Sequence, residues 1–247
     1  MTFLPVVQRE LRVAARKGST FWLRVWAALA ALLIGSAFLA ICIITGTNSA
    51  RFGPSLFGTL TWLALVTTIA AGLFFTADSL SEEKREGTLG FLFLTDLSGM
   101  DVVGGKLLAT SLRGSYALLA IFPILGTTLL MGGVTGGQFW RSSLALVNAL
   151  FYSLAVGLLV SALSRNSQHA LAGTFFLLLF LCGVGPLIDS SLTTVRPSGV
   201  QPFFRYTSPA YVFWAATAWG RTGFWPALAI SHLIAWANLV LSGFLVR

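Results

Sequence analysis

The 247-residue sequence has few charged residues, since Asp, Glu, Lys and Arg together make up only 10% of it. Soluble globular domains carry about 25% charged residues. Here 56% of the residues are hydrophobic, and the mean hydropathy is +0.83. The composition therefore excludes an ordinary soluble domain and predicts an integral membrane protein.

Cysteine and histidine are also scarce, with two residues of each. Cys42 and Cys182 lie within apolar runs, which favours packing in the core over a disulfide framework or a metal site. His169 and His232 are far apart, and neither forms a metal-ligand spacing with another His or with Glu. The adjacent Glu82–Glu83 pair lies in a charged loop, so an intramembrane protease is disfavoured and we expect no metal and no catalytic residue.

The net charge of +8 has no nucleic-acid-binding motif to accompany it. Basic residues are spread through the predicted loops, which favours a membrane-topology signal over nucleic-acid binding. The N-terminal apolar run, 21–44, is longer than the hydrophobic region of a signal peptide and predicts an uncleaved first membrane helix.

Six apolar runs approach the length of about 20 residues that a membrane-spanning helix needs. The sequence therefore predicts an all-α polytopic membrane protein, a single transmembrane domain over 1–247. Its spans are expected near 21–44, 56–77, 107–131, 141–163, 170–188 and 224–246. Before them, residues 3–17 mix apolar side chains with Arg9, Glu10 and Arg12, which predicts an amphipathic helix on the membrane surface.

Counting basic residues gives the orientation. With the N-terminus inside, eleven Lys and Arg residues lie on the inner face and five lie outside. This asymmetry predicts that both termini, and the segment 79–106 between the second and third spans, are cytoplasmic. His169 and Asp189 fall at predicted helix ends, where solvation at the membrane interface is the expected environment.

Segment 79–106 is the one polar segment with a regular pattern. Ser79 and Glu82 have the spacing of a capping box that begins a helix, and Ser98 and Asp101 have the spacing of a second one. Gly87 is expected to bend the chain between the two. Beyond it, an apolar stripe is formed by Leu89, Leu92 and Phe93.

Three short motifs in this segment carry a family resemblance: Glu83-Lys-Arg-Glu-Gly-Thr-Leu, Leu94-Thr-Asp-Leu-Ser98 and Gly105-Lys106-Leu-Leu-Ala109. They resemble the loop between the second and third membrane helices of type-2 ATP-binding-cassette (ABC) transporter permeases. The sequence departs from that pattern at Gly90, where many relatives carry Glu, and at Asp96, where Pro is common. These departures affect the expected docking surface and the turn before Ser98.

The resemblance implies the permease of an exporter in the plasma (inner) membrane, paired with a second permease subunit and with ABC ATPase subunits. Segment 79–106 would be the coupling helix that docks on the ATPase, and 3–17 the elbow helix. The docking residues implied are Glu82, Glu83, Arg85, Glu86, Gly87, Thr88, Leu89, Leu92 and Phe93.

Nothing in the chain matches an ATP-binding loop of its own. Gly99 and Gly104 have the right separation, but Lys106 is followed by Leu107, where such a loop needs Ser or Thr. We therefore expect no cofactor on this chain and place ATP and Mg on the partner ATPase, with membrane lipids around the chain and no nucleic acid.

The predicted outer loop, 189–223, is too long for a plain connection. Ser208, Pro209 and Gly220 mark the N-cap, first residue and end of a short helix within it. With Pro209, Tyr211 and Trp214 this helix resembles the short external helices of type-2 exporters, and it is a candidate gate or an interfacial segment.

Two alternatives remain open at this stage. A secondary transporter would place ionisable groups in mid-membrane and show related halves, whereas this sequence has almost no mid-membrane charge and no visible repeat. A membrane scaffold without transport activity is the other alternative.

Overall fold

The computed structural model describes residues 18–45, 49–77, 79–87, 99–195, 204–217 and 223–246, and over these ranges it is all-α without strands. The predicted surface helix 3–17 and residues 88–98 lie outside these ranges. In chain order the elements are α2 (Gly18–Thr45), α3 (Ser49–Thr76), α4 (Ser79–Glu86), α6 (Gly99–Leu130), α7 (Gly136–Leu163), α8 (Ser167–Val195), the 3₁₀ turn η1 (Phe204–Thr207), α9 (Pro209–Thr217) and α10 (Phe224–Leu245).

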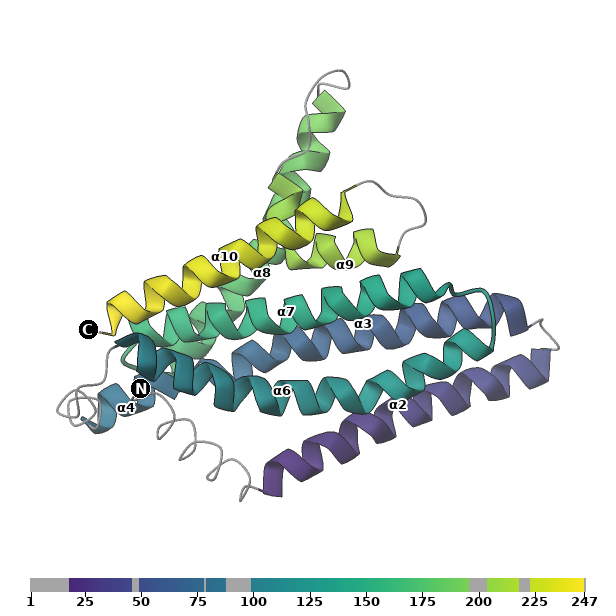
Figure 1. Ribbon diagram of the computed structural model, residues 1–247, viewed down its shortest axis with the longest axis horizontal. Coiled ribbons are helices and arrows are strands. Elements are labelled where there is room, and N and C mark those ends of the chain that lie inside the picture. Colours follow the sequence, from purple (N-terminus) through teal and green to yellow (C-terminus); the bar gives the residue numbers. More distant parts are fainter. Residues whose placement is uncertain are drawn as a thin grey trace.

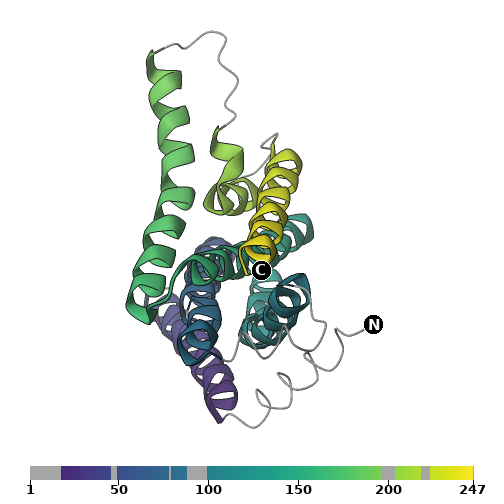
Figure 2. The same ribbon diagram turned by 90° about the vertical axis from the view of Figure 1, so that its left-hand side faces the viewer.

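Helix α7 occupies the centre of the bundle, with α3 and α10 packed along it and α6 beside α3 (Figure 1). In its most apolar window 83% of the residues are buried, against 17% for α8. Figure 2 shows why: α8 rises away from the other helices and stands apart over much of its length. A helix that is apolar on all sides but exposed suits a lipid environment.

Five helical stretches in the described ranges are long and apolar enough to cross a membrane: Gly53–Arg85, Gly99–Leu130, Gly136–Leu163, Ser167–Ser191 and Phe224–Leu245. The first of these runs through α3 into α4. Helix α2 contains the predicted first span but contributes only a shorter apolar stretch, Ala28–Ala37. The structure therefore supports five of the six predicted spans by length and composition.

The two larger clusters of buried side chains fill most of the bundle. One includes Phe57, Leu60, Leu146 and Phe213, and joins α3, α6 and α7 to α9. The other includes Leu80, Tyr152 and Leu239, and joins α4, α7, α8 and α10. Segments α4 and α9 are thus packed into the bundle through apolar side chains.

Helix α8 is longer than the predicted span 170–188, and it continues through Pro186 to Val195. The first part of the predicted loop 189–223 is therefore helical, up to Val195. Proline has no N–H, so a proline within a helix leaves the carbonyl four residues earlier without its usual partner. That carbonyl belongs to Cys182, and the hydroxyl of Ser208 donates to it at 2.7 Å. The distant serine thereby lets the helix pass through the proline.

Candidate functional site

The first candidate site is the end of the bundle that carries α4 (Figure 1). The last turn of α7 holds the start of α4, because the Ser161 hydroxyl oxygen accepts the backbone N–H groups of Leu80 at 2.9 Å and Ser81 at 3.1 Å. Lys84 donates from Nζ to the Ala162 carbonyl. The C-terminal end of a helix carries partial negative charge, which favours a cation there. Helix α4 is therefore fixed to α7 by its backbone and by a charged side chain.

A salt bridge ties the same helix to α6. Lys106 Nζ lies 2.8 Å from Glu83 Oε1, and both side chains are largely buried, with exposures of 14% and 16%. Water screens such a pair less than it screens an exposed one. Glu83, predicted as a docking residue, thus uses its carboxylate within the chain.

Helix α4 ends one turn after this contact. Helix α4 ends at Glu86, and Gly87 has φ 71°, a left-handed conformation that glycine adopts without steric cost. The predicted bend at Gly87 is therefore present. Arg85 and Gly87 are exposed. Among the other predicted docking residues, the side chains of Glu82 and Glu86 and the whole of Thr88, Leu89, Leu92 and Phe93 lie outside the described residues, as do the predicted elbow residues Arg9, Glu10 and Arg12.

The second candidate site lies at the other end of the bundle, where η1 and α9 pack on α8. Helix α9 begins at Pro209, and its N-cap is Ser208, whose hydroxyl oxygen accepts from the Tyr211 N–H at 3.4 Å. The far end of α9 is held by α7, since Gln138 Nε2 donates to the Thr217 carbonyl at 2.8 Å. The predicted short helix and its cap are both present.

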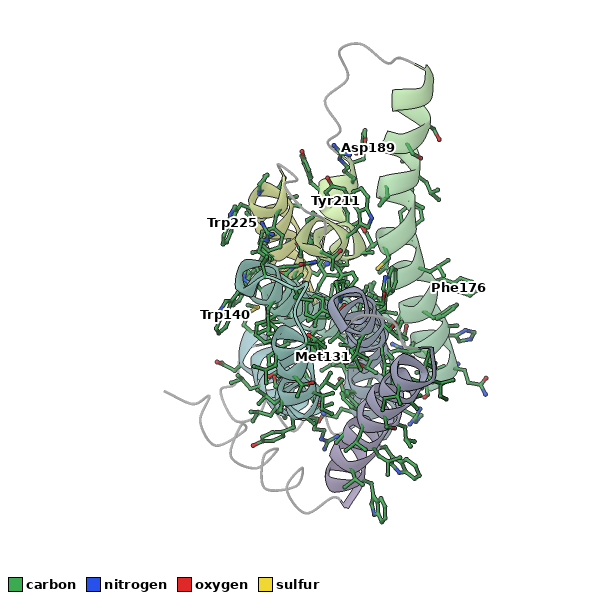
Figure 3. All side chains as sticks on the ribbon, turned by 90° about the vertical axis from the view of Figure 1, so that its right-hand side faces the viewer. Met131, Trp140, Phe176, Asp189, Tyr211 and Trp225 are labelled. Atoms are coloured by element: carbon green, nitrogen blue, oxygen red, sulfur yellow. The ribbon has the colours of Figure 1, made fainter. Side chains whose placement is uncertain are left out.

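Asp189 fixes η1 to α8. Its two carboxylate oxygens accept the backbone N–H groups of Phe204 at 3.3 Å and Arg205 at 2.6 Å. Figure 3 places Asp189 and Tyr211 in the space between α8 and the η1–α9 segment. Asp189 is only 4% exposed, so the expected interfacial solvation is wrong for this residue. Its carboxylate instead binds the backbone of a segment that follows it by fifteen residues.

Arg205 lies beside this contact. Its guanidinium carbon is 5.0 Å from the centre of the Tyr211 ring and 5.7 Å from that of Tyr206, both within cation–π range. Its Nε is buried and has no hydrogen-bond partner among the described residues. The three predicted gate residues have different environments: Pro209 and Tyr211 are buried, whereas Trp214 is 42% exposed.

Sequence reasoning did not identify Ser161 or Asp189 as anchors. The role of Asp189 could have been suspected from the sequence, because Asp189 is the only acidic residue after Asp101 and follows an apolar run. Ser161 had only a weak signal: Gly157 and Ser161 have the small-residue spacing that permits close helix contact, but in a chain with 25 glycines such spacings arise by chance. The described residues contain no cluster of His, Cys, Asp and Glu that could hold a metal ion.

The fold and these sites define a multi-pass α-helical membrane protein. The charged helix α4 is fixed at one end of the bundle, and the short, largely buried helix α9 packs at the other. The model of the ABC-2 family transporter proteins matches residues 13–246. The chain therefore belongs to the ABC-2 transporter family, and it is the membrane component of such a transporter. Family membership implies an ATPase partner. No curated protein matches the sequence significantly.

Proposed function

We propose that the chain is the permease subunit of an ABC exporter, with six membrane spans, both termini in the cytoplasm and a second permease subunit beside it. ATP and Mg would bind to two partner ATPase subunits. Segment 79–106 would receive the movement of the ATPase pair. The observation that carries this proposal is the attachment of α4 to both α6 and α7.

The attachment gives the docking segment a mechanical connection to the bundle. A push on the segment after Gly87 would reach α4, and Ser161 and the Ala162 carbonyl would pass it to α7. Since α7 is the central helix, its displacement moves the helices packed on it. The Glu83–Lys106 salt bridge adds a second connection, to α6. Closure of the ATPase pair would thereby change access to the two sides of the membrane.

The experiment is co-purification from the native membrane in mild detergent, followed by mass spectrometry. We expect an ABC ATPase to accompany the wild-type chain and to be lost with Arg85→Glu, because Arg85 is exposed in the last turn of α4. Gln168→Glu is the control, since Gln168 is exposed in the first turn of α8 near the same end. It should keep the ATPase.

Charge exchange separates the internal role of Glu83 from direct docking. Glu83→Lys alone places three lysines together and should release α4 and the ATPase. The double variant Glu83→Lys/Lys106→Glu restores an ion pair and should recover co-purification. Loss of the ATPase in the double variant would show that the ATPase contacts the Glu83 carboxylate directly. A wild-type chain that purifies without any ATPase would contradict the proposal and favour a secondary transporter or a scaffold.

A further inference from the structure

A groove between α3 and α8 consists of two adjoining cavities. The first has a volume of about 610 Å³ and lies beside η1 and α9, where Trp62, Asp189, Arg205 and Trp214 line it. The second has a volume of about 300 Å³ and lies further along the same two helices. Cys182 lines both cavities, so they meet at this residue. The proposed function does not by itself assign a ligand to either cavity.

The second cavity is apolar along its whole length. Its lining comes from α3 and α8 only: Val66, Ile69, Ala70, Leu73, Phe175, Leu178, Leu179 and Cys182. From Trp62 in the first cavity to Leu73 in the second is eleven residues of α3, or about 17 Å at 1.5 Å per residue. The groove therefore offers an apolar surface comparable in length to one acyl chain.

The first cavity supplies the polar end. Arg205 is held there by Tyr206 and Tyr211, and its backbone N–H binds Asp189. Both oxygens of Asp189 accept backbone N–H groups, so this carboxylate serves the fold of η1. The buried Nε of Arg205 has no acceptor among the described residues. A guanidinium with an unused donor beside an apolar channel suits an acidic oxygen on an amphiphile.

We propose that this groove binds a lipid-like amphiphile, with an acidic headgroup at Arg205 and one apolar tail along α3 and α8. Such a molecule is then the substrate class of the transporter, a step that rests on the proposed function. The headgroup would lie at the η1–α9 end of the bundle, opposite the ATPase. The tail would lie against the helix that stands furthest from the bundle, α8.

Photo-crosslinking of the full chain in lipid nanodiscs tests binding without any ATPase. The probe is phosphatidylglycerol with a diazirine in one acyl chain, and adducts are mapped by mass spectrometry. We expect adducts on 66–73 and 175–182. Arg205→Gln should lower their yield about fivefold, because one arginine near a lipid headgroup contributes an interaction of that size. Unlabelled phosphatidylglycerol should compete better than phosphatidylcholine.

Two further variants make the test decisive. Ala70→Phe places a ring in the tail cavity and should reduce adducts independently of Arg205, while Arg141→Gln is the control, since Arg141 also has a buried Nε but lines neither cavity. Adducts absent from the groove, or equal for all variants, would overturn the binding site. Equal competition by phosphatidylcholine would overturn the acidic class.

A second arm uses the complex with the co-purified ATPase. Adducts that decrease during ATP turnover support a transported amphiphile, whereas adducts that persist unchanged identify a resident lipid and overturn the substrate assignment. The photo-crosslinking experiment in nanodiscs needs no ATPase. If no ATPase co-purifies with the chain, the proposed function is contradicted, but the result on lipid binding in the groove is unaffected.

Discussion

Single hydroxyl groups hold the two functional ends of this bundle. Ser161 binds two N–H groups at the start of α4, and Ser208 binds the carbonyl that Pro186 leaves open in α8. Both serines are fully buried. In an apolar surrounding an unsatisfied polar group is costly, so each hydroxyl determines where a distant segment attaches.

Ser208→Ala should lower stability by about 1–3 kcal/mol, because the Cys182 carbonyl loses the hydroxyl that takes the place of the N–H missing at Pro186. In a Pro186→Ala background, residue 186 regains an N–H that can bond to this carbonyl within the helix. The same Ser208→Ala change should then cost about 1 kcal/mol less, leaving mainly the loss of the α9 N-cap. Apparent melting temperatures of the four proteins in one detergent measure this coupling.

Equal losses in the two backgrounds would contradict the assignment of Ser208 to the proline gap. They would leave the serine with its N-cap role alone, as the bond to the Tyr211 N–H indicates.

At the scale of elements, α3 and α7 pack along each other through a contact that repeats after one turn. Along α7 the contact residues are Ser153 and Gly157, which are four residues apart, and Ser161, one turn further on, binds the start of α4. Ser153 Oγ donates to the Thr68 carbonyl at 2.6 Å, and Gly157 lies against Gly72 and Thr76 of α3. Residues four apart share one face of a helix, so small side chains at this spacing let two backbones approach.

Gly72→Ala tests this contact. A Cβ at position 72 would collide with the backbone carbonyl of Ser153, so the helices must separate, and we expect a loss of about 1–3 kcal/mol. Gly58→Ala is the control in the same helix, because a Cβ there meets nothing within 4 Å. That variant should be neutral or slightly stabilising, since alanine favours helix more than glycine does. Thermal unfolding of both in detergent would contradict the close approach if their melting temperatures fell equally.

Sequence reasoning recovered the elements better than their contacts. The helix cap at Ser208–Pro209 and the turn at Gly87 follow from local backbone chemistry, and both are present. The end of α8 could not be predicted, because Pro186 is a helix breaker unless Ser208, 22 residues later, satisfies Cys182. Similarly, the salt bridge between Glu83 and Lys106 depends on how α4 packs against α6. The spacing of residues along the sequence does not determine that packing. Long-range contacts decided each of these outcomes.

At the scale of the whole molecule, the number of spans decides on which side the N-terminus lies. Within the part of the chain that the structure describes, five stretches satisfy the criteria for a membrane-spanning helix, and α2 is the sixth long helix. It has 28 residues, which is about 42 Å at 1.5 Å per residue and more than the hydrocarbon thickness. With six spans the termini share one side, whereas with five they lie on opposite sides.

Single cysteines in a Cys42→Ser/Cys182→Ser background can establish the topology. We expect Thr135→Cys, in the turn before α7, to react with a membrane-impermeant maleimide in intact cells. Asn166→Cys, in the turn after α7, should react only after permeabilisation, because α7 separates the two turns. Thr2→Cys then decides the number of spans. The excess of basic residues near the N-terminus favours the cytoplasm, so it should behave like Asn166→Cys if α2 crosses the membrane. Labelling of Thr2→Cys in intact cells would instead show five spans, with α2 lying along the bundle without crossing.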